Sequence, residues 1–338
     1  MATAQQSVFK FGIEIELLLE SCNEQHKKWD DLAGNLSQRL SDAGLPNQID
    51  MANDYSQWSL VREVTIQGKP DQHGIELVSP VYTATASSLF HSDLSTLFTT
   101  LTTHFRIHSA PSCSSHIHIS RTPPLSPLET ASLAKATLYF ESALNALMPP
   151  VRRKRDSYWA KSNRCVDNPA LAGLSLSQCL AKVEDAAAAA PGCLGVDPRP
   201  VVEVMNMLSR TTTYAIVKGR KEDFVRGKTY RWDFTGLLSS ASEGDVVERG
   251  ILGTVEFRQP PGSGSAEEAV GWVSLGVMFV VGAVEGGWET GGAGVAAEGG
   301  SLEELRALVE RGREVIGWKK ENMGSLDRLF RRVGHLYS

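Results

Sequence analysis

The stretch Phe9-Lys-Phe-Gly-Ile-Glu-Ile-Glu-Leu17 alternates between apolar and polar side chains over most of its length. Successive side chains of a β-strand point to opposite faces, so this stretch predicts a strand with two unlike faces. The apolar face carries Phe9, Phe11, Ile13, Ile15 and Leu17, and the other face carries Glu14 and Glu16. A strand of this kind favours an antiparallel sheet with one face on the core and the other open to a cleft.

Two further stretches share this alternation, Ser114-Ser-His-Ile-His-Ile-Ser120 and Gly253-Thr-Val-Glu-Phe-Arg-Gln259. In the first, His116 and His118 oppose two isoleucines, and in the second, Glu256 and Arg258 oppose Val255 and Phe257. Carboxylates, imidazoles and guanidinium groups bind hard divalent cations and phosphates. The three strands therefore predict an enzyme site laid across the sheet.

The composition is that of an ordinary soluble globular protein, with 338 residues, 42% of them hydrophobic and 22% charged. A net charge of −5 gives no general affinity for nucleic acid or for an anionic membrane. Five cysteines without CxxC spacing indicate reduced thiols, and the N-terminus shows no signal-peptide pattern. The most apolar run, 270–284, is shorter than the roughly 20 residues of a membrane span, so we expect a buried helix in a cytoplasmic protein.

The remaining elements mix strands and helices with short connections. Stretches 58–66 and 74–79 read as a β-hairpin, and four segments show helical periodicity: 29–43, 87–103, 127–148 and 175–190. A Gly/Ala-rich loop is expected over 285–300, followed by a last helix over 301–320 that opens with the capping box Ser301-Leu-Glu-Glu304. We expect one α+β domain spanning 1–338, with a mainly antiparallel sheet and helices on one face.

Each polar motif also has a simpler interpretation. Glu14 and Glu16 could be an exposed acidic pair, and His116 and His118 could be a zinc pair, a hydrogen-bonded pair or a chance pattern. Glu256 and Arg258 could form a surface ion pair, and the basic run 152–155 could be a solvated loop. The chain has no Walker A loop and no GxGxxG turn after a strand, so any use of ATP does not depend on either.

Five short motifs follow one another in an order that resembles the family of putative amidoligases, which is related to glutamine synthetase and glutamate–cysteine ligase. They are Gly12-Ile-Glu-Ile-Glu16, Trp58-Ser-Leu-Val-Arg-Glu-Val-Thr65, Gly74-Ile-Glu-Leu-Val-Ser-Pro80, Cys113-Ser-Ser-His-Ile-His118 and Gly253-Thr-Val-Glu-Phe-Arg-Gln259. The resemblance covers about residues 9–262. It implies a glutamine-synthetase-like catalytic domain with a curved antiparallel sheet, which uses ATP with Mg²⁺, or with Mn²⁺.

The resemblance also assigns roles to residues of this chain. The implied metal ligands are Glu14, Glu16, Glu76, His118 and Glu256. The implied nucleotide-site residues are Glu14, His116, Arg152, Tyr158 and Asp233, and the implied catalytic residues are Glu63, Arg153 and Arg258, the last on a phosphate. The chain departs from the family at Glu63 and Thr65, where Asp and Ser are usual, and at Asp233, where Asn is frequent. These departures concern the substrate rather than the metal site.

The leading hypothesis is therefore an ATP-dependent ligase that joins a carboxylate to an amine through an acyl phosphate. Its substrates would be small molecules or peptides. One rival is a metal-dependent hydrolase that uses His116 and His118, although a third histidine ligand is missing. The other rival is a catalytically inactive protein that binds a nucleotide or a metal, although carboxylates facing one cleft repel one another without a cation.

Overall fold

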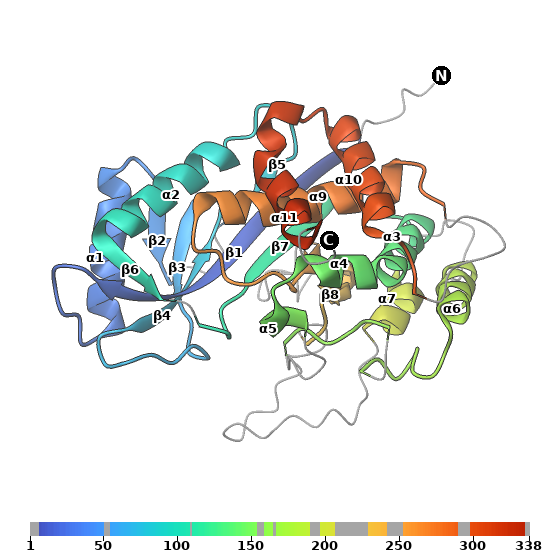
Figure 1. The fold of residues 1–338 in the computed structure, drawn as a ribbon, viewed down its shortest axis with the longest axis horizontal. Coiled ribbons are helices and arrows are strands. Elements are labelled where there is room, and N and C mark those ends of the chain that lie inside the picture. Colours follow the sequence, from blue (N-terminus) through green and yellow to red (C-terminus); the bar gives the residue numbers. More distant parts are fainter. Residues whose placement is uncertain are drawn as a thin grey trace. The chain divides into compact units, whose positions relative to one another are not determined.

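The computed structural model describes residues 7–50, 55–108, 110–153, 159–164, 167–189, 197–206, 229–241, 253–289 and 298–334. The chain divides into two compact units. The sheet unit comprises Lys10–His118, Pro260–Val277 and Gly317–Ser338, and the helical unit comprises Met1–Phe9, Ile119–Gln259 and Met278–Ile316. The predicted α+β class with a mostly antiparallel open sheet is confirmed (Figure 1). The single-domain assignment stays a prediction.

Strand β1 (Val8–Ser21) is the longest strand and organises the sheet unit. Three strands pair with it in antiparallel fashion: β4 (His73–Val78), β5 (Tyr82–Thr83) and β6 (Phe105–His108). Strand β3 (Trp58–Arg62) is antiparallel to β4, and β2 (Asn47–Ile49) is parallel to β3. The order β2-β3-β4-β1 confirms the predicted hairpin of β3 and β4. Strand β7 (Ser115–Thr122) begins in this unit and ends in the other.

The structure buries the apolar side chains of β1 on one face of the strand, as the sequence predicts. Its five apolar side chains from Phe9 to Leu17 are all buried, and Ile15 has no exposed surface. In the sheet unit, α1 (Trp29–Asp42) and α2 (Phe90–His104) lie beside the strands (Figure 1). Both bury leucines at helical spacing, including Leu32, Leu36 and Leu40 of α1. Burial of this kind supplies most of the free energy that holds helices to a sheet.

An aromatic cluster ties the C-terminal segment to the same unit. The ring of Phe11 lies 5.6 Å from Tyr82, 5.2 Å from Phe90 and 6.1 Å from Trp318. The indole Nε1 of Trp318 donates a hydrogen bond of 2.9 Å to the carbonyl of Thr85. The segment then continues as a 3₁₀ turn, η2 (Lys320–Met323), and as α11 (Gly324–Gly334). Trp318 therefore anchors residues far apart in the sequence to one apolar face.

The helical unit contains most of the remaining helices. They are α3 (Pro127–Tyr139), α4 (Glu141–Leu147), α5 (Pro150–Arg153), α6 (Leu176–Ala188), α7 (Arg199–Met205), η1 (Thr235–Ala241) and α10 (Leu302–Ile316). Two short antiparallel strands, β8 (Trp232–Asp233) and β9 (Val255–Phe257), accompany them. Buried amide side chains tie loops together here: Asn163 donates to the carbonyl of Trp232 at 2.9 Å, and Asn206 donates to the same carbonyl at 2.9 Å.

Helix α9 (Ala266–Glu285) runs from the sheet unit into the helical unit. Among the described residues it is the one helix long and apolar enough to cross a membrane, but 83% of its apolar window is buried inside the protein. It is therefore the core helix that its composition predicts. In the helical unit, α9 and α10 pack closely at Gly312, where an added Cβ would lie 1.9 Å from the Met278 carbonyl.

Some element boundaries differ from the predictions. The helix expected over 127–148 is divided at Phe140, whose ring packs on Tyr139 and Phe279. The strand expected over 58–66 ends at Arg62, because the Glu63 carboxylate accepts hydrogen bonds from the backbone N–H and the hydroxyl of Thr65 and forms a turn. The last helix stops at Ile316, before a glycine with φ of 75° at 317, and α11 was not predicted. Within the expected loop over 285–300, residues 290–297 lie outside the described part of the chain.

We predict that Ile15→Ala lowers the free energy of unfolding by about 2–5 kcal/mol, because it leaves a cavity in a fully buried site. Lys10→Ala is the matched control, since Lys10 is exposed on the same strand and its loss should cost less than about 0.5 kcal/mol. Urea denaturation of the two variants measures both values. A larger loss for Lys10→Ala would mean that the two faces of β1 are assigned in reverse.

Candidate functional site

The polar face of β1 carries Glu14 and Glu16, two residues apart on the strand. Their side chains are mostly enclosed, with 23% of Glu14 and 11% of Glu16 exposed to solvent. Glu16 lies directly opposite Glu76 in the antiparallel register of β1 and β4. The strand pairing therefore brings carboxylates together on one face, as the sequence predicts for the first and third motifs.

Two histidines of β7 lie against the carboxylate of Glu14. One carboxylate oxygen, Oε2, lies 3.3 Å from Nδ1 of His116, and the other, Oε1, lies 3.2 Å from Nε2 of His118. Burial acts to raise the pKa of Glu14, but the charge of His118 and hydrogen bonds from both histidines hold that pKa well below its ordinary value. Glu14 is thus an ionised carboxylate held between two imidazoles.

Within the described part of the sheet unit, two groups of side chains offer ligand atoms that all lie within 4.8 Å of one another. One group is Glu14, Glu76 and His116, and the other is Glu16, Glu63 and Glu76. Glu76 belongs to both groups, so the two positions adjoin. Carboxylate oxygens with one imidazole suit a hard divalent cation such as Mg²⁺ or Mn²⁺. These residues therefore fit the metal that the sequence resemblance implies.

Ser114 links the two groups through hydrogen bonds. Its backbone N–H donates to Oε2 of Glu16 at 2.9 Å, and its hydroxyl donates to the same oxygen at 2.5 Å. The hydroxyl also lies 2.8 Å from Nε2 of His116. Ser114 and His116 are both almost completely buried, with 4% of each residue exposed.

These contacts fix the orientation of the His116 ring. The Ser114 hydroxyl has one O–H donor, which it directs to Glu16, so toward Nε2 of His116 it serves as a hydrogen-bond acceptor. On the other side of the ring, Nδ1 of His116 lies 3.3 Å from Oε2 of Glu14. An imidazole ligand whose other nitrogen is held in this way is oriented for a metal. Ser114 is therefore a positioning residue that supports both groups.

Among the described residues, Ser114 and Tyr55 also belong to this site, although the sequence motifs assign no role to either. Ser114 precedes His116 by two positions, the spacing of one strand face, so its sequence position carries a signal. Burial raises the pKa of Tyr55, and the negative charges of Glu14 and Glu76 raise it further. Tyr55 comes just before β3 outside any strand, so no periodic pattern connects it with these carboxylates.

Glu256, Arg258 and Asp233 lie in the helical unit, on the short strand pair and directly after it. Glu256 and Arg258 form an ion pair in which 7% of each side chain is exposed, so it is not a surface ion pair. Asp233 is opposite Glu256 in the register, and burial together with the charge of Glu256 raises its pKa. The structure thus brings these three predicted residues together.

The two described arginines of the basic run bind backbone carbonyls. Arg152 is buried and donates from Nε to the carbonyl of Gln259 and from Nη2 to that of Arg258, both at 2.9 Å. Arg153 donates from Nε to the carbonyl of Met148 at 2.5 Å, next to the end of α4. Both arginines therefore hold structure in the helical unit, and their predicted roles toward ATP and substrate stay predictions. Tyr158 lies outside the described residues.

Residues 7–170 match the model of a protein family described as putative amidoligase enzyme. The match covers just under half of the chain and includes the first four of the five motifs, with Glu14, Glu16, Glu63, Glu76, His116 and His118. It confirms the resemblance identified from those motifs, while Glu256 and Arg258 fall beyond it. The family description suggests an enzyme that forms an amide bond. A comparison with curated proteins gave no significant match.

We predict that Ser114→Ala weakens Mn²⁺ binding by about tenfold or more, because it removes the hydrogen bonds that orient Glu16 and His116. Electron paramagnetic resonance titration of free Mn²⁺ measures the change. Ser114→Thr keeps the hydroxyl and should recover much of the affinity, and Ser95→Ala, at an exposed serine of α2, should change nothing. Equal affinities in Ser114→Ala and Ser95→Ala would contradict the positioning role.

Proposed function

We propose that this protein is an ATP- and Mg²⁺-dependent ligase that joins a carboxylate to an amine, because residues 7–170 match the model of the amidoligase family. The observation that carries the proposal is the pair of adjoining ligand groups around Glu76 in the sheet unit. We further propose that the enzyme acts in the cytoplasm on small-molecule or peptide substrates, in keeping with its scattered cysteines.

The proposed reaction has two steps. A carboxylate oxygen of the acid attacks the γ-phosphorus of ATP, ADP departs, and an acyl phosphate forms. The nitrogen of the amine then attacks the acyl carbon, inorganic phosphate departs, and the nitrogen loses a proton. Both steps bring anionic groups together, so the protein must position them and neutralise their charge.

The acidic face of the sheet unit can accept the phosphates of ATP only when cations are bound. ATP phosphates would be repelled by Glu14, Glu16, Glu63 and Glu76 unless positive charge lay between them. A divalent cation held by these residues and His116 would supply that charge and polarise the phosphate oxygens. Ser114 would keep Glu16 and His116 in the required orientation.

The helical unit contributes the groups that the resemblance assigns to phosphate. We propose that Arg258 neutralises charge on the transferred phosphoryl group, since a guanidinium forms paired hydrogen bonds with phosphate oxygens. Its buried ion pair with Glu256 would hold the guanidinium in a fixed orientation. Asp233, next to Glu256 in the register, stands where the family often has Asn and belongs to the same set.

The rival functions have less support. Neither ligand group in the sheet unit contains more than one histidine, which disfavours a histidine-rich hydrolase site. An inactive protein without a bound cation would carry four like charges in one cluster, which raises the free energy of the folded protein.

We predict that ATP binds about tenfold or more tightly in the presence of Mg²⁺ than in EDTA, because the cation screens the phosphates from the carboxylates. Isothermal titration calorimetry measures both affinities. Absence of ATP binding with Mg²⁺ or Mn²⁺ present would overturn the proposed function.

We further predict that Glu16→Gln lowers phosphate release from ATP by about a hundredfold or more, because it removes a charged ligand while keeping the size of the side chain. The assay uses a panel of acid–amine pairs. Glu303→Gln, at an exposed glutamate of α10, is the control and should retain full activity. Full activity in Glu16→Gln would place the metal elsewhere.

A further inference from the structure

A buried ion pair of the helical unit has no part in the function proposed above. Nη1 of Arg231 lies 3.0 Å from Oε1 of Glu141, and only 6% of the first side chain and 11% of the second are exposed. Glu141 begins α4, and Arg231 directly precedes β8. The desolvation of two charges offsets most of their attraction, so a buried pair contributes little net stability. Its directional contacts are better suited to positioning.

Further hydrogen bonds hold both charged groups in place. Oε1 of Glu141 accepts a hydrogen bond of 2.5 Å from the hydroxyl of Ser162, and Oε2 accepts one of 3.1 Å from the N–H of Asn163. Nε of Arg231 donates to the carbonyl of Ala160 at 3.2 Å. Because each group has several partners in different directions, neither side chain can turn without breaking a hydrogen bond.

The main chain of Arg231 is bonded to Arg258. The Arg231 carbonyl accepts a hydrogen bond of 2.8 Å from the N–H of Arg258. This bond continues the antiparallel ladder of β8 and β9, in which Asp233 lies opposite Glu256. The side chain of Arg231 is therefore fixed on Glu141, while its main chain holds the segment that carries Arg258.

Helix α4 is attached to the same segment at a second point. Asn145 lies one helical turn after Glu141, and its Oδ1 accepts a hydrogen bond of 3.0 Å from the side chain of Gln259. The carbonyl of Arg258 accepts a hydrogen bond of 2.9 Å from Nη2 of Arg152. Both backbone polar groups of Arg258 thus have hydrogen-bond partners, so the backbone from which its side chain extends is fixed in space.

We propose that Glu141 and Arg231 are positioning residues that set the direction of the Arg258 guanidinium. A displacement of about 1 Å at a reacting group can cost about a hundredfold in rate, so a rigid anchor for this side chain has a use in catalysis. The contact of Arg258 with a phosphoryl group rests on the proposed function. The link from Glu141 through Arg231 to Arg258 rests only on the hydrogen bonds described above.

The test removes the anchor without leaving one charge buried alone. In the double variant Glu141→Leu/Arg231→Met, apolar side chains of similar length replace the ion pair, a change that buried pairs often tolerate. Lys135→Met/Glu184→Leu is the matched control, because this pair joins α3 to α6 and 71% of the Glu184 side chain is exposed. A further variant, Arg231→Lys, keeps the charge beside Glu141 and decides the test if circular dichroism shows that the double variant does not fold.

The position of Arg258 is read from its side-chain Nε–H signal in ¹H–¹⁵N spectra, which the spectrum of Arg258→Lys assigns. We expect the double variant and Arg231→Lys to shift this signal and to speed its exchange with solvent by about tenfold or more, whereas the control variant should change neither. An unchanged Arg258 signal in a folded variant overturns the proposal. This readout needs no ATP, so it decides the positioning role whether or not the proposed function holds.

Kinetics add a second check where the protein releases phosphate from ATP. The double variant should lower kcat by about tenfold or more and leave KM for ATP unchanged, because it misplaces a group that acts in the transition state. In an Arg258→Lys background the same replacement should cost nothing further, since its effect passes through Arg258. Additive losses in the two backgrounds overturn the positioning role and leave the ion pair a structural one.

Discussion

The alternation of β1 is the constraint on which the rest of the structure depends. One strand supplies the apolar side chains that α2 and the Trp318 segment cover, and its other face supplies Glu14 and Glu16. A shift of the strand register by one residue would exchange the two faces and bury both carboxylates in the core. The hydrophobic face therefore fixes the position of the acidic face, and the pairing with β4 then places Glu76 opposite Glu16.

Gathering carboxylates on one face has an electrostatic cost. The structure offsets part of it with protein groups: two imidazoles of β7 lie against Glu14, and Ser114 gives two hydrogen bonds to Glu16. These partners do not remove the charge of Glu63 and Glu76, which adjoin the same cluster. A divalent cation would complete the neutralisation, and the ionised state of Glu14, favoured by its lowered pKa, keeps its oxygens available as ligands.

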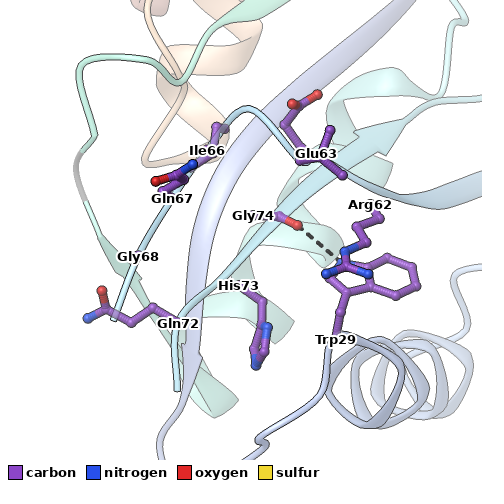
Figure 2. Close-up of a pocket in the computed structure, with 10 residues that line it drawn as sticks. Trp29, Arg62, Glu63, Ile66, Gln67, Gly68, Gln72, His73 and Gly74 are labelled. Carbon is purple, nitrogen blue, oxygen red and sulfur yellow. Dashed lines mark hydrogen bonds between the residues drawn. The ribbon is translucent and has the colours of Figure 1, made fainter. Parts of the chain in front are cut away.

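The sequence predicted the parts of the site that follow from strand periodicity. Glu14 and Glu16 on β1, the histidines of β7 and the hairpin that carries Glu76 all depend on local alternation, which survives in the folded chain. The division of the 127–148 helix at Phe140 and the early end of β3 depend on packing and on a side-chain turn at Glu63, so periodicity alone did not reveal them. A pocket beside Arg62 (Figure 2) arises from contacts between the turn after β3, the strand β4 and Trp29 of α1, and no single motif encodes such contacts.

The arginines of the helical unit also show which contacts the sequence could predict and which it could not. A basic run in a sequence suggests a solvated loop or an anion site. In this protein, Arg152 donates to the carbonyl of Gln259, just after β9, and Arg153 donates to the carbonyl of Met148, just after α4. Arg258 pairs with Glu256 two positions before it on the same strand face, which the alternation did predict. The spacing of charged residues along a strand therefore predicts which of them form ion pairs, whereas the number of charges in a segment does not.

The central claim is that the acidic face of the sheet unit holds divalent cations. Diffraction from crystals grown with Mn²⁺, recorded at the manganese absorption edge, tests it directly. The account predicts an anomalous peak coordinated by Glu76 together with Glu14 and His116, or with Glu16 and Glu63. An anomalous peak that lies elsewhere on the protein, with none at Glu76, would contradict it.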